Sequence, residues 1–125
     1  MGLKGPSELS EQIVVVRALR ASGLLFCAVP NGGRRSRTEA LAFKMSGVVA
    51  GAPDLLIFTP PPASKGFGGH VGTALEMKRA GGVPSDLRKE QRAWLEGLQL
   101  CGWAAVVGYG AEDAIAKLRT LGYRV

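Results

Sequence analysis

The chain has 125 residues, the length of a single domain, and its 46% hydrophobic and 21% charged content excludes a disordered tail. Sixteen Lys and Arg against ten Asp and Glu give a net charge of +6, which favours a polyanionic partner. Two isolated cysteines, Cys27 and Cys101, and one histidine exclude a disulfide framework and a structural zinc site. Both cysteines lie in apolar stretches, which predicts buried thiols.

Hydrophobic spacing and turn residues predict the element order α-β-α-β-β-α-β-α. The first half is expected to hold a helix over 7–21, a buried strand over 24–29, a helix over 38–45 capped by Thr38, and a strand over 54–58. An exposed Pro- and Gly-rich loop over 59–69 precedes a strand over 72–79, a helix from Ser85 to Leu100, a strand over 103–107 and a helix over 111–121. This alternation predicts an α/β domain with a mixed central sheet of about four strands flanked by helices.

No apolar segment approaches the ~20 residues that a membrane span needs. We therefore expect one soluble domain over residues 1–125, located in the cytoplasm. Nucleotide-cofactor sites are not expected either, because the chain contains no GxxxxGK[ST], and its Gly66–Val71 stretch ends in Val71 where GxGxxG has a glycine.

Two carboxylates, Asp54 and Glu76, lie within apolar strand sequence. Removing a carboxylate from water costs on the order of several kcal/mol unless it is paired or binds a metal. The strand period of two puts Glu76 and Lys78 on one face, and the preceding strand could bring Asp54 near them. Two carboxylates and a backbone carbonyl would form an oxygen site for Mg²⁺, beside a lysine that could orient water or neutralise a phosphate. The alternative is that each carboxylate lies half-exposed at a strand end, paired with an arginine.

The spacing of these motifs resembles a known signature. Gly51-Ala52-Pro53-Asp54 followed by Glu76-Met77-Lys78 resembles the GxPD…ExK pattern of PD-(D/E)XK nucleases, and within them the VRR-NUC family of stand-alone phage and bacterial type. The similarity spans nearly the whole chain, including the Pro30-Asn31-Gly32 corner. It implies a restriction-endonuclease-like core and a Mg²⁺- or Mn²⁺-dependent DNA endonuclease. Small members of the family act as homodimers on branched DNA such as Holliday junctions.

The same resemblance assigns roles to residues. It implies that Asp54, Glu76 and the carbonyl of Met77 are metal ligands and that Lys78 is the catalytic lysine. Gln91 matches a family glutamine that helps to shape the active site, although a glutamine at the edge of an apolar helix face is the simpler alternative.

A glutamate of the first helix also reaches the metal in this family, directly or through water, and both Glu8 and Glu11 are candidates. Gln12, Val15 and Leu19 follow Glu8 along one side of the helix, so Glu8 lies beside the buried stripe. Glu11 is turned about 60° further towards solvent. The helical geometry therefore favours Glu8.

Basic residues flank the expected metal site in the sequence and predict a surface that follows DNA phosphates. The candidates are Arg34, Arg35, Arg37, Lys44, Arg79 and Arg88. Taken singly, each is better explained as an ordinary solvated charge. Few aromatic residues lie among them, which favours duplex or branched DNA over stacking on single-stranded bases.

Two other classes of function fit part of this pattern. A non-catalytic DNA-binding module could keep the same fold, but the intact set of Asp54, Glu76 and Lys78 argues against it. An RNA-associated basic protein would fit the charge and would leave the two strand carboxylates unexplained.

Overall fold

The computed structural model describes residues 5–30, 36–64 and 69–125. The elements in these ranges are α1 (Glu8–Ala21), β1 (Phe26–Ala28), α2 (Arg37–Met45), β2 (Leu55–Ile57), the 3₁₀ helix η1 (Pro62–Ser64), β3 (Thr73–Lys78), the 3₁₀ helix η2 (Pro84–Asp86), α3 (Lys89–Leu100), β4 (Ala104–Tyr109) and α4 (Ala111–Thr120). The strands form one sheet in the order β1-β2-β3-β4. Strand β2 pairs antiparallel with β1 and β3, and β3 pairs parallel with β4. The predicted mixed four-stranded α/β fold and its order of elements are confirmed.

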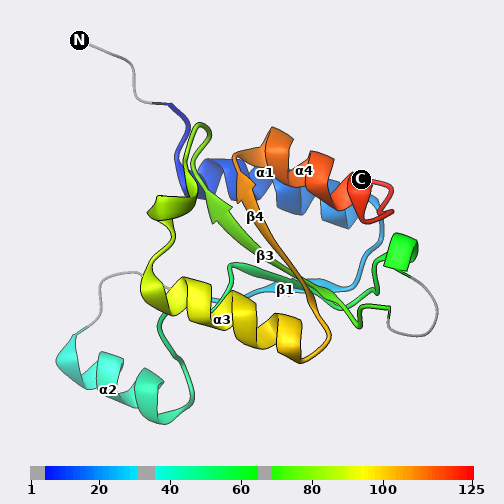
Figure 1. The fold of residues 1–125 in the computed structure, drawn as a ribbon. Helices are drawn as coiled ribbons and strands as arrows, with labels where there is room; N and C mark the ends of the chain where they lie inside the picture. Colours follow the sequence, from blue (N-terminus) through cyan, green and yellow to red (C-terminus); the bar gives the residue numbers. More distant parts are fainter. Residues whose placement is uncertain (1–4, 31–35, 65–68) are drawn as a thin grey trace.

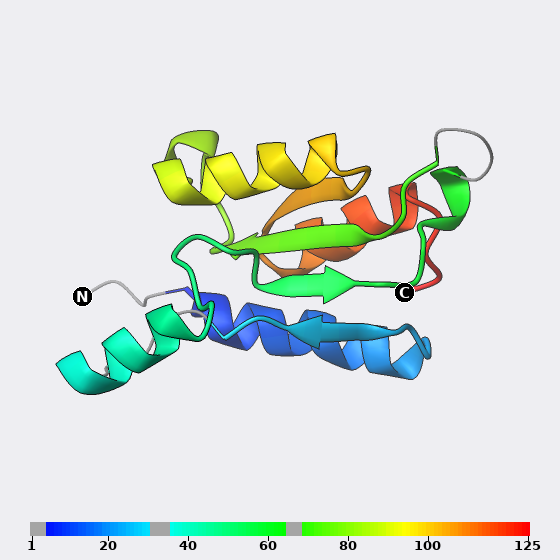
Figure 2. The ribbon, with the colours of Figure 1, turned by 90° about the horizontal axis from the view of Figure 1, so that it is seen from below.

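The alternation of side chains divides the sheet between two layers of helix. Leu55, Ile57, Leu75 and Met77 are fully buried and form the main hydrophobic core with residues of α1 and α4. The intervening Glu76 and Lys78 of β3 face α3, where both contact the Gln91 side chain. Helix α3 therefore lies on the opposite side of the sheet from α1 (Figures 1 and 2).

Helix α1 packs against the core with fewer buried apolar side chains than its sequence suggests. Ser7 caps it, since the Ser7 side chain accepts a hydrogen bond from the Ser10 amide. Val15 and Leu19, four residues apart, are fully buried, whereas Leu9 and Ile13 are 66% and 45% exposed. The second half of the helix is thus held by apolar packing and its first turn is not.

Two predicted helix starts are wrong. Helix α2 begins at Arg37 because Ser36, rather than Thr38, caps it by accepting from the Glu39 amide. Helix α3 begins at Lys89 because Ser85 lies in η2, a separate turn in which the Asp86 carboxylate accepts from the Val83 amide at 2.8 Å. Sequence position alone does not decide which of several nearby polar residues becomes the cap.

The predicted burial of the cysteines is also wrong. Both Cys27 and Cys101 are exposed. Strand β1 is short and lies at an edge of the sheet, with Cys27 and Ala28 exposed rather than buried on both faces. Cys101 follows the last turn of α3 as its C-cap, where the chain turns back at the surface.

The loop after β2 is partly packed rather than wholly exposed. Pro61 is fully buried, and the Ala63 amide donates to the Leu121 carbonyl at 2.9 Å. The first part of this loop therefore packs against the C-terminal segment, while residues 65–68 lie outside the described ranges.

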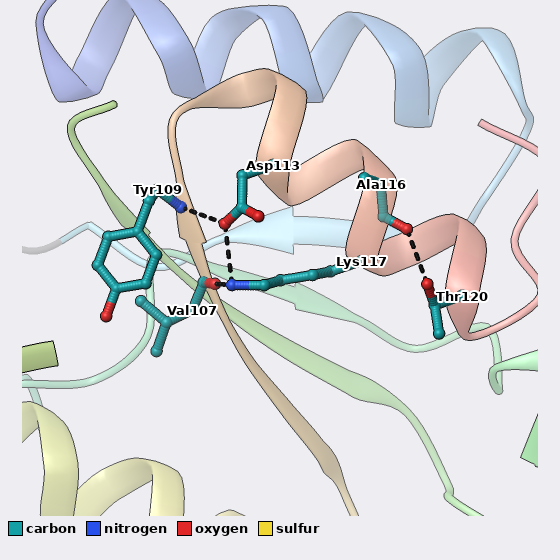
Figure 3. Close-up of polar contacts among 6 residues, drawn as sticks. All are labelled: Val107, Tyr109, Asp113, Ala116, Lys117 and Thr120. Atoms are coloured by element: carbon teal, nitrogen blue, oxygen red, sulfur yellow. Dashed lines mark hydrogen bonds and ion pairs between the residues drawn. The ribbon is translucent and has the colours of Figure 1, made fainter. Parts of the chain in front are cut away.

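Polar contacts attach α4 to β4 (Figure 3). The Asp113 carboxylate accepts from the Tyr109 amide at 2.9 Å and pairs with Lys117 at 2.9 Å, and Lys117 donates to the Val107 carbonyl at 2.7 Å. Partial burial alone would raise the pKa of Asp113, but the hydrogen bonds from Lys117 and from the Tyr109 amide lower it below its ordinary value. The start of α4 is thereby fixed beside the end of β4. In the described part of the chain, no helix has the length and apolar character of a membrane span.

Candidate active site

The site is built where β2 begins and β3 ends. Leu55 pairs with Leu75 in antiparallel register, so the preceding residue, Asp54, lies alongside the end of β3. One Asp54 carboxylate oxygen accepts a hydrogen bond from the Met77 amide at 2.7 Å. The structure therefore brings Asp54 to the strand that carries Glu76 and Lys78. The starts of α1 and α3 lie at the same end of the molecule (Figures 1 and 2).

A tight turn at Gly51, three residues before Asp54, packs against α3. Gly51 has a φ of +88°, and an added Cβ would lie 2.6 Å from the backbone carbon of Glu90. Ala52 and Pro53, which follow, are buried. Only glycine meets both the positive φ and the close approach, which explains the glycine that opens the Gly51–Asp54 motif.

Gln91 links the Glu76 and Lys78 side chains of β3. It is only 6% exposed; its Nε2 donates to Glu76 Oε1 at 2.9 Å, and its Oε1 accepts from Lys78 Nζ at 2.9 Å and from the Arg88 amide at 3.0 Å. This amide orientation follows from chemistry, because the Lys78 ammonium and the Arg88 amide can only donate, so Gln91 Oε1 faces them and Nε2 faces Glu76. Gln91 is therefore a buried bridge rather than a glutamine at the edge of a helix face.

Among the atoms of this site, the second carboxylate oxygen of Glu76 most strongly indicates a place for a bound ligand. Glu76 is 3% exposed, and its Oε2 is buried without a hydrogen-bond partner among the described residues. The pKa of Glu76 is raised from 4.5 to about 8, chiefly by burial and also by the neighbouring Asp54 carboxylate, while the Lys78 ammonium opposes the rise. Two carboxylates gathered in a buried site are stabilised by an added positive charge.

The residues present fit a hard divalent cation. The available donors are oxygens, from the carboxylates of Asp54 and Glu76 and the backbone of Met77, and this is the donor class that Mg²⁺ and Mn²⁺ prefer. The described ranges contain no group of three or more His, Cys, Asp or Glu side chains arranged to hold a metal. A cation here would therefore complete its shell with water, as Mg²⁺ commonly does.

The two glutamates of α1 have different surroundings. Glu8 is close enough to Glu76 to contribute to the rise of its pKa. The Glu11 carboxylate instead accepts a hydrogen bond from the amide of Ala111, the first residue of α4. Glu8 therefore remains the α1 carboxylate on the side of Glu76, whereas Glu11 is committed to another helix.

Sequence reasoning missed this contact of Glu11, which it assigned to solvent. One signal for it was present. The N-cap of α4 is Gly110, which has no side chain to accept a hydrogen bond from the first turn. The first amides of such a helix are left to water or to an acceptor from another part of the chain.

Four of the six predicted DNA-contacting residues can be placed. Arg79 directly follows β3 and Arg88 precedes α3, so both flank the site, and both are exposed. Arg37 and Lys44 are exposed on α2, which has no buried side chain and projects from the body of the protein (Figure 1). Both Arg34 and Arg35 lie outside the described residues.

Comparison with known proteins gives the chain a family. The sequence profile of the VRR-NUC domain matches residues 6–112, a range that contains the site residues from Glu8 to Gln91. A solved structure named "VRR_NUC domain protein" is 28% identical to this chain and superposes on it with a TM-score of 0.67, covering 98% of this chain and 91% of its own. A search of curated proteins finds no match. The chain therefore belongs to the VRR-NUC domain family, whose domain is of the DNA-binding nuclease type.

Proposed function

We propose that this protein is a Mg²⁺- or Mn²⁺-dependent DNA endonuclease that hydrolyses phosphodiester bonds beside the C-terminal end of β3. The single observation that carries the proposal is the buried, unpartnered Oε2 of Glu76 beside Asp54. In a chain of the nuclease-type family, that oxygen is best explained as a ligand for a cation.

Each residue of the site then has a distinct task. Asp54, Glu76 and the carbonyl of Met77 would hold the cation, and Glu8 would reach it directly or through water. A divalent cation bound there would polarise the phosphodiester and lower the pKa of an attacking water. Asp54 also keeps its hydrogen bond to the Met77 amide, which fixes the orientation of its carboxylate.

Lys78 is the residue that acts on the reacting phosphate. Its ammonium has three hydrogens, of which one is donated to Gln91 Oε1. The remaining hydrogens can orient the attacking water or stabilise the charge that develops on the phosphate oxygens. Gln91 is a positioning residue, because it holds both Glu76 and Lys78 and supplies no group to the reaction.

The substrate we propose is branched DNA such as a Holliday junction, cleaved by a homodimer. The net charge of +6 and the exposed Arg79 and Arg88 beside the site support contacts with a phosphate backbone. Arg37 and Lys44 on the projecting α2 would extend these contacts away from the site. A junction needs a pair of cuts related by a two-fold axis, which two copies of one site can supply.

Cleavage of labelled DNA tests the function. We expect the wild-type protein to cut a four-way junction in Mg²⁺ or Mn²⁺, to cut a linear duplex of the same arms more slowly, and to cut neither in EDTA. Binding without cleavage under every cation would favour a non-catalytic DNA-binding module. Equal affinity for a structured RNA and the junction, again without cleavage, would favour the RNA-associated alternative.

A further inference from the structure

We propose that Glu11 is a positioning residue of the metal site: its carboxylate anchors the first turn of α1 to the junction of β3 and α4, and so holds Glu8 beside Glu76. This inference rests on the proposed function, in which Glu8 reaches the cation. Glu11 itself does not contact the cation.

The anchor is a hydrogen bond between two helices. Glu11 Oε2 accepts from the Ala111 amide at the start of α4. The first amides of a helix have no partner within the helix, and the N-cap Gly110 offers no side chain to them. The negative charge of Glu11 is also favourable at the positive end of the α4 dipole. Glu11 thus supplies to the first turn of α4 a hydrogen-bond acceptor that the N-cap residue Gly110 lacks.

The same junction is continuous with the strand that carries the site. The Gly110 amide donates to the Lys78 carbonyl at 2.8 Å. Gly110 has a φ of +86°, and an added Cβ would lie 2.9 Å from the Cβ of Ala80 and 3.3 Å from Glu11 Oε2. The Glu11 carboxylate, the start of α4 and the segment that follows β3 therefore lie close together around Gly110.

The first turn of α1 depends on this anchor because apolar packing does not reach it. The buried side chains of the helix, Val15 and Leu19, lie in its second half, and Leu9 is 66% exposed. Val15 is about 10 Å along the axis from Glu8. Glu8 and Glu11, three residues apart, are neighbours on the helix surface. Fixing the Glu11 carboxylate therefore fixes the helix at the point from which Glu8 projects.

The test measures the affinity of the DNA-free protein for Mn²⁺ by calorimetry. We expect Glu11→Ala to weaken binding about tenfold or more, the range found when groups that support metal ligands are removed. Glu11→Gln keeps an acceptor oxygen for the Ala111 amide, so it should stay within about threefold of wild type. Glu112→Ala removes an exposed charge from the same turn of α4 and should leave the affinity unchanged.

A double-mutant cycle distinguishes positioning from general damage. If Glu11 acts through Glu8, then Glu11→Ala should have no further effect on Mn²⁺ affinity in a Glu8→Ala background. Should Glu11→Ala fail to fold, Glu11→Asp takes its place, since it keeps the charge and shortens the reach by one methylene.

The outcomes separate this proposal from the one on which it rests. Two results would overturn the role of Glu11 alone, provided that Asp54→Ala abolishes Mn²⁺ binding. The first is a Glu11→Ala variant that binds Mn²⁺ as tightly as wild type. The second is a Glu11→Ala change that weakens Mn²⁺ binding just as much in the Glu8→Ala background. A wild-type protein that binds no Mn²⁺, or an Asp54→Ala variant that binds as tightly as wild type, would overturn both.

Discussion

Replacing Asp54 by asparagine should lower the single-turnover rate of DNA cleavage in Mg²⁺ by about 10³-fold, and Lys78→Met should lower it by at least about 10²-fold. Asparagine keeps an oxygen that can accept from the Met77 amide, so the hydrogen bond that now measures 2.7 Å can persist while the charge proposed to hold the cation is lost. Lys78→Met keeps the aliphatic stem and removes the donors that we propose act on the phosphate. Affinity for the junction in Ca²⁺ should change little in either variant.

Matched controls exist for both changes. The Asp86 carboxylate also accepts from a backbone amide, that of Val83, so Asp86→Asn tests the loss of a hydrogen-bonded aspartate outside the site. Lys117 is likewise a hydrogen-bonded lysine, on α4, and Lys117→Met tests the loss of such a charge. Both controls should cut at close to the wild-type rate. Unreduced cleavage by Asp54→Asn and Lys78→Met together would show that this site does not perform the hydrolysis.

The metal-free protein should become less stable as the pH rises from about 4.5 to about 8, because of Glu76. Its pKa is raised from 4.5 to about 8 in the folded protein, chiefly by burial. The folded state then holds a proton that the unfolded state releases, so the stabilisation is complete below about pH 4.5 and is lost as the pH rises through about 8. One pKa unit corresponds to about 1.4 kcal/mol, so the whole effect is at most about 5 kcal/mol.

Urea unfolding in EDTA at pH 5, 6, 7 and 8 measures this slope, with Glu76→Gln as the reference. The glutamine keeps an acceptor for Gln91 and has no proton to lose, so the difference between the two proteins isolates Glu76 from the other titrating groups. Saturating Mn²⁺ should restore stability to the wild type at pH 8 and should do so less at pH 5, because the cation competes with the proton. Parallel pH profiles for the two proteins would contradict the buried, ionisable state of Glu76.

The structural features that the sequence predicts well are those that depend only on residues near one another in the chain. The strand period correctly placed Glu76 and Lys78 on one face of β3, because successive side chains alternate whatever the strand packs against. By contrast, the N-cap residues Ser36 of α2 and Arg88 of α3 could not be chosen in advance, since several nearby residues could have preceded either helix.

Features that depend on distant partners were not predictable in detail. Gln91 was identified as a candidate, but its simultaneous bonds to Glu76, Lys78 and the Arg88 amide arise from the way α3 packs on β3. The contact of Glu11 with Ala111 joins residues 100 positions apart, and helical geometry alone turned its side chain towards solvent. The exposure of Cys27 follows from the position of β1 at the sheet edge, which an apolar stretch of sequence does not reveal.

The central claim is that Asp54 and Glu76 hold a divalent cation. A crystal structure with Mn²⁺, in which anomalous scattering locates the ion, tests it most directly. The account predicts one ion beside the C-terminal end of β3, within about 2.3 Å of a carboxylate oxygen of Asp54 and of Glu76 Oε2, with the Met77 carbonyl in its shell. A structure at saturating Mn²⁺ in which no ion contacts Glu76 Oε2, or in which Mn²⁺ is bound only elsewhere on the protein, would contradict it.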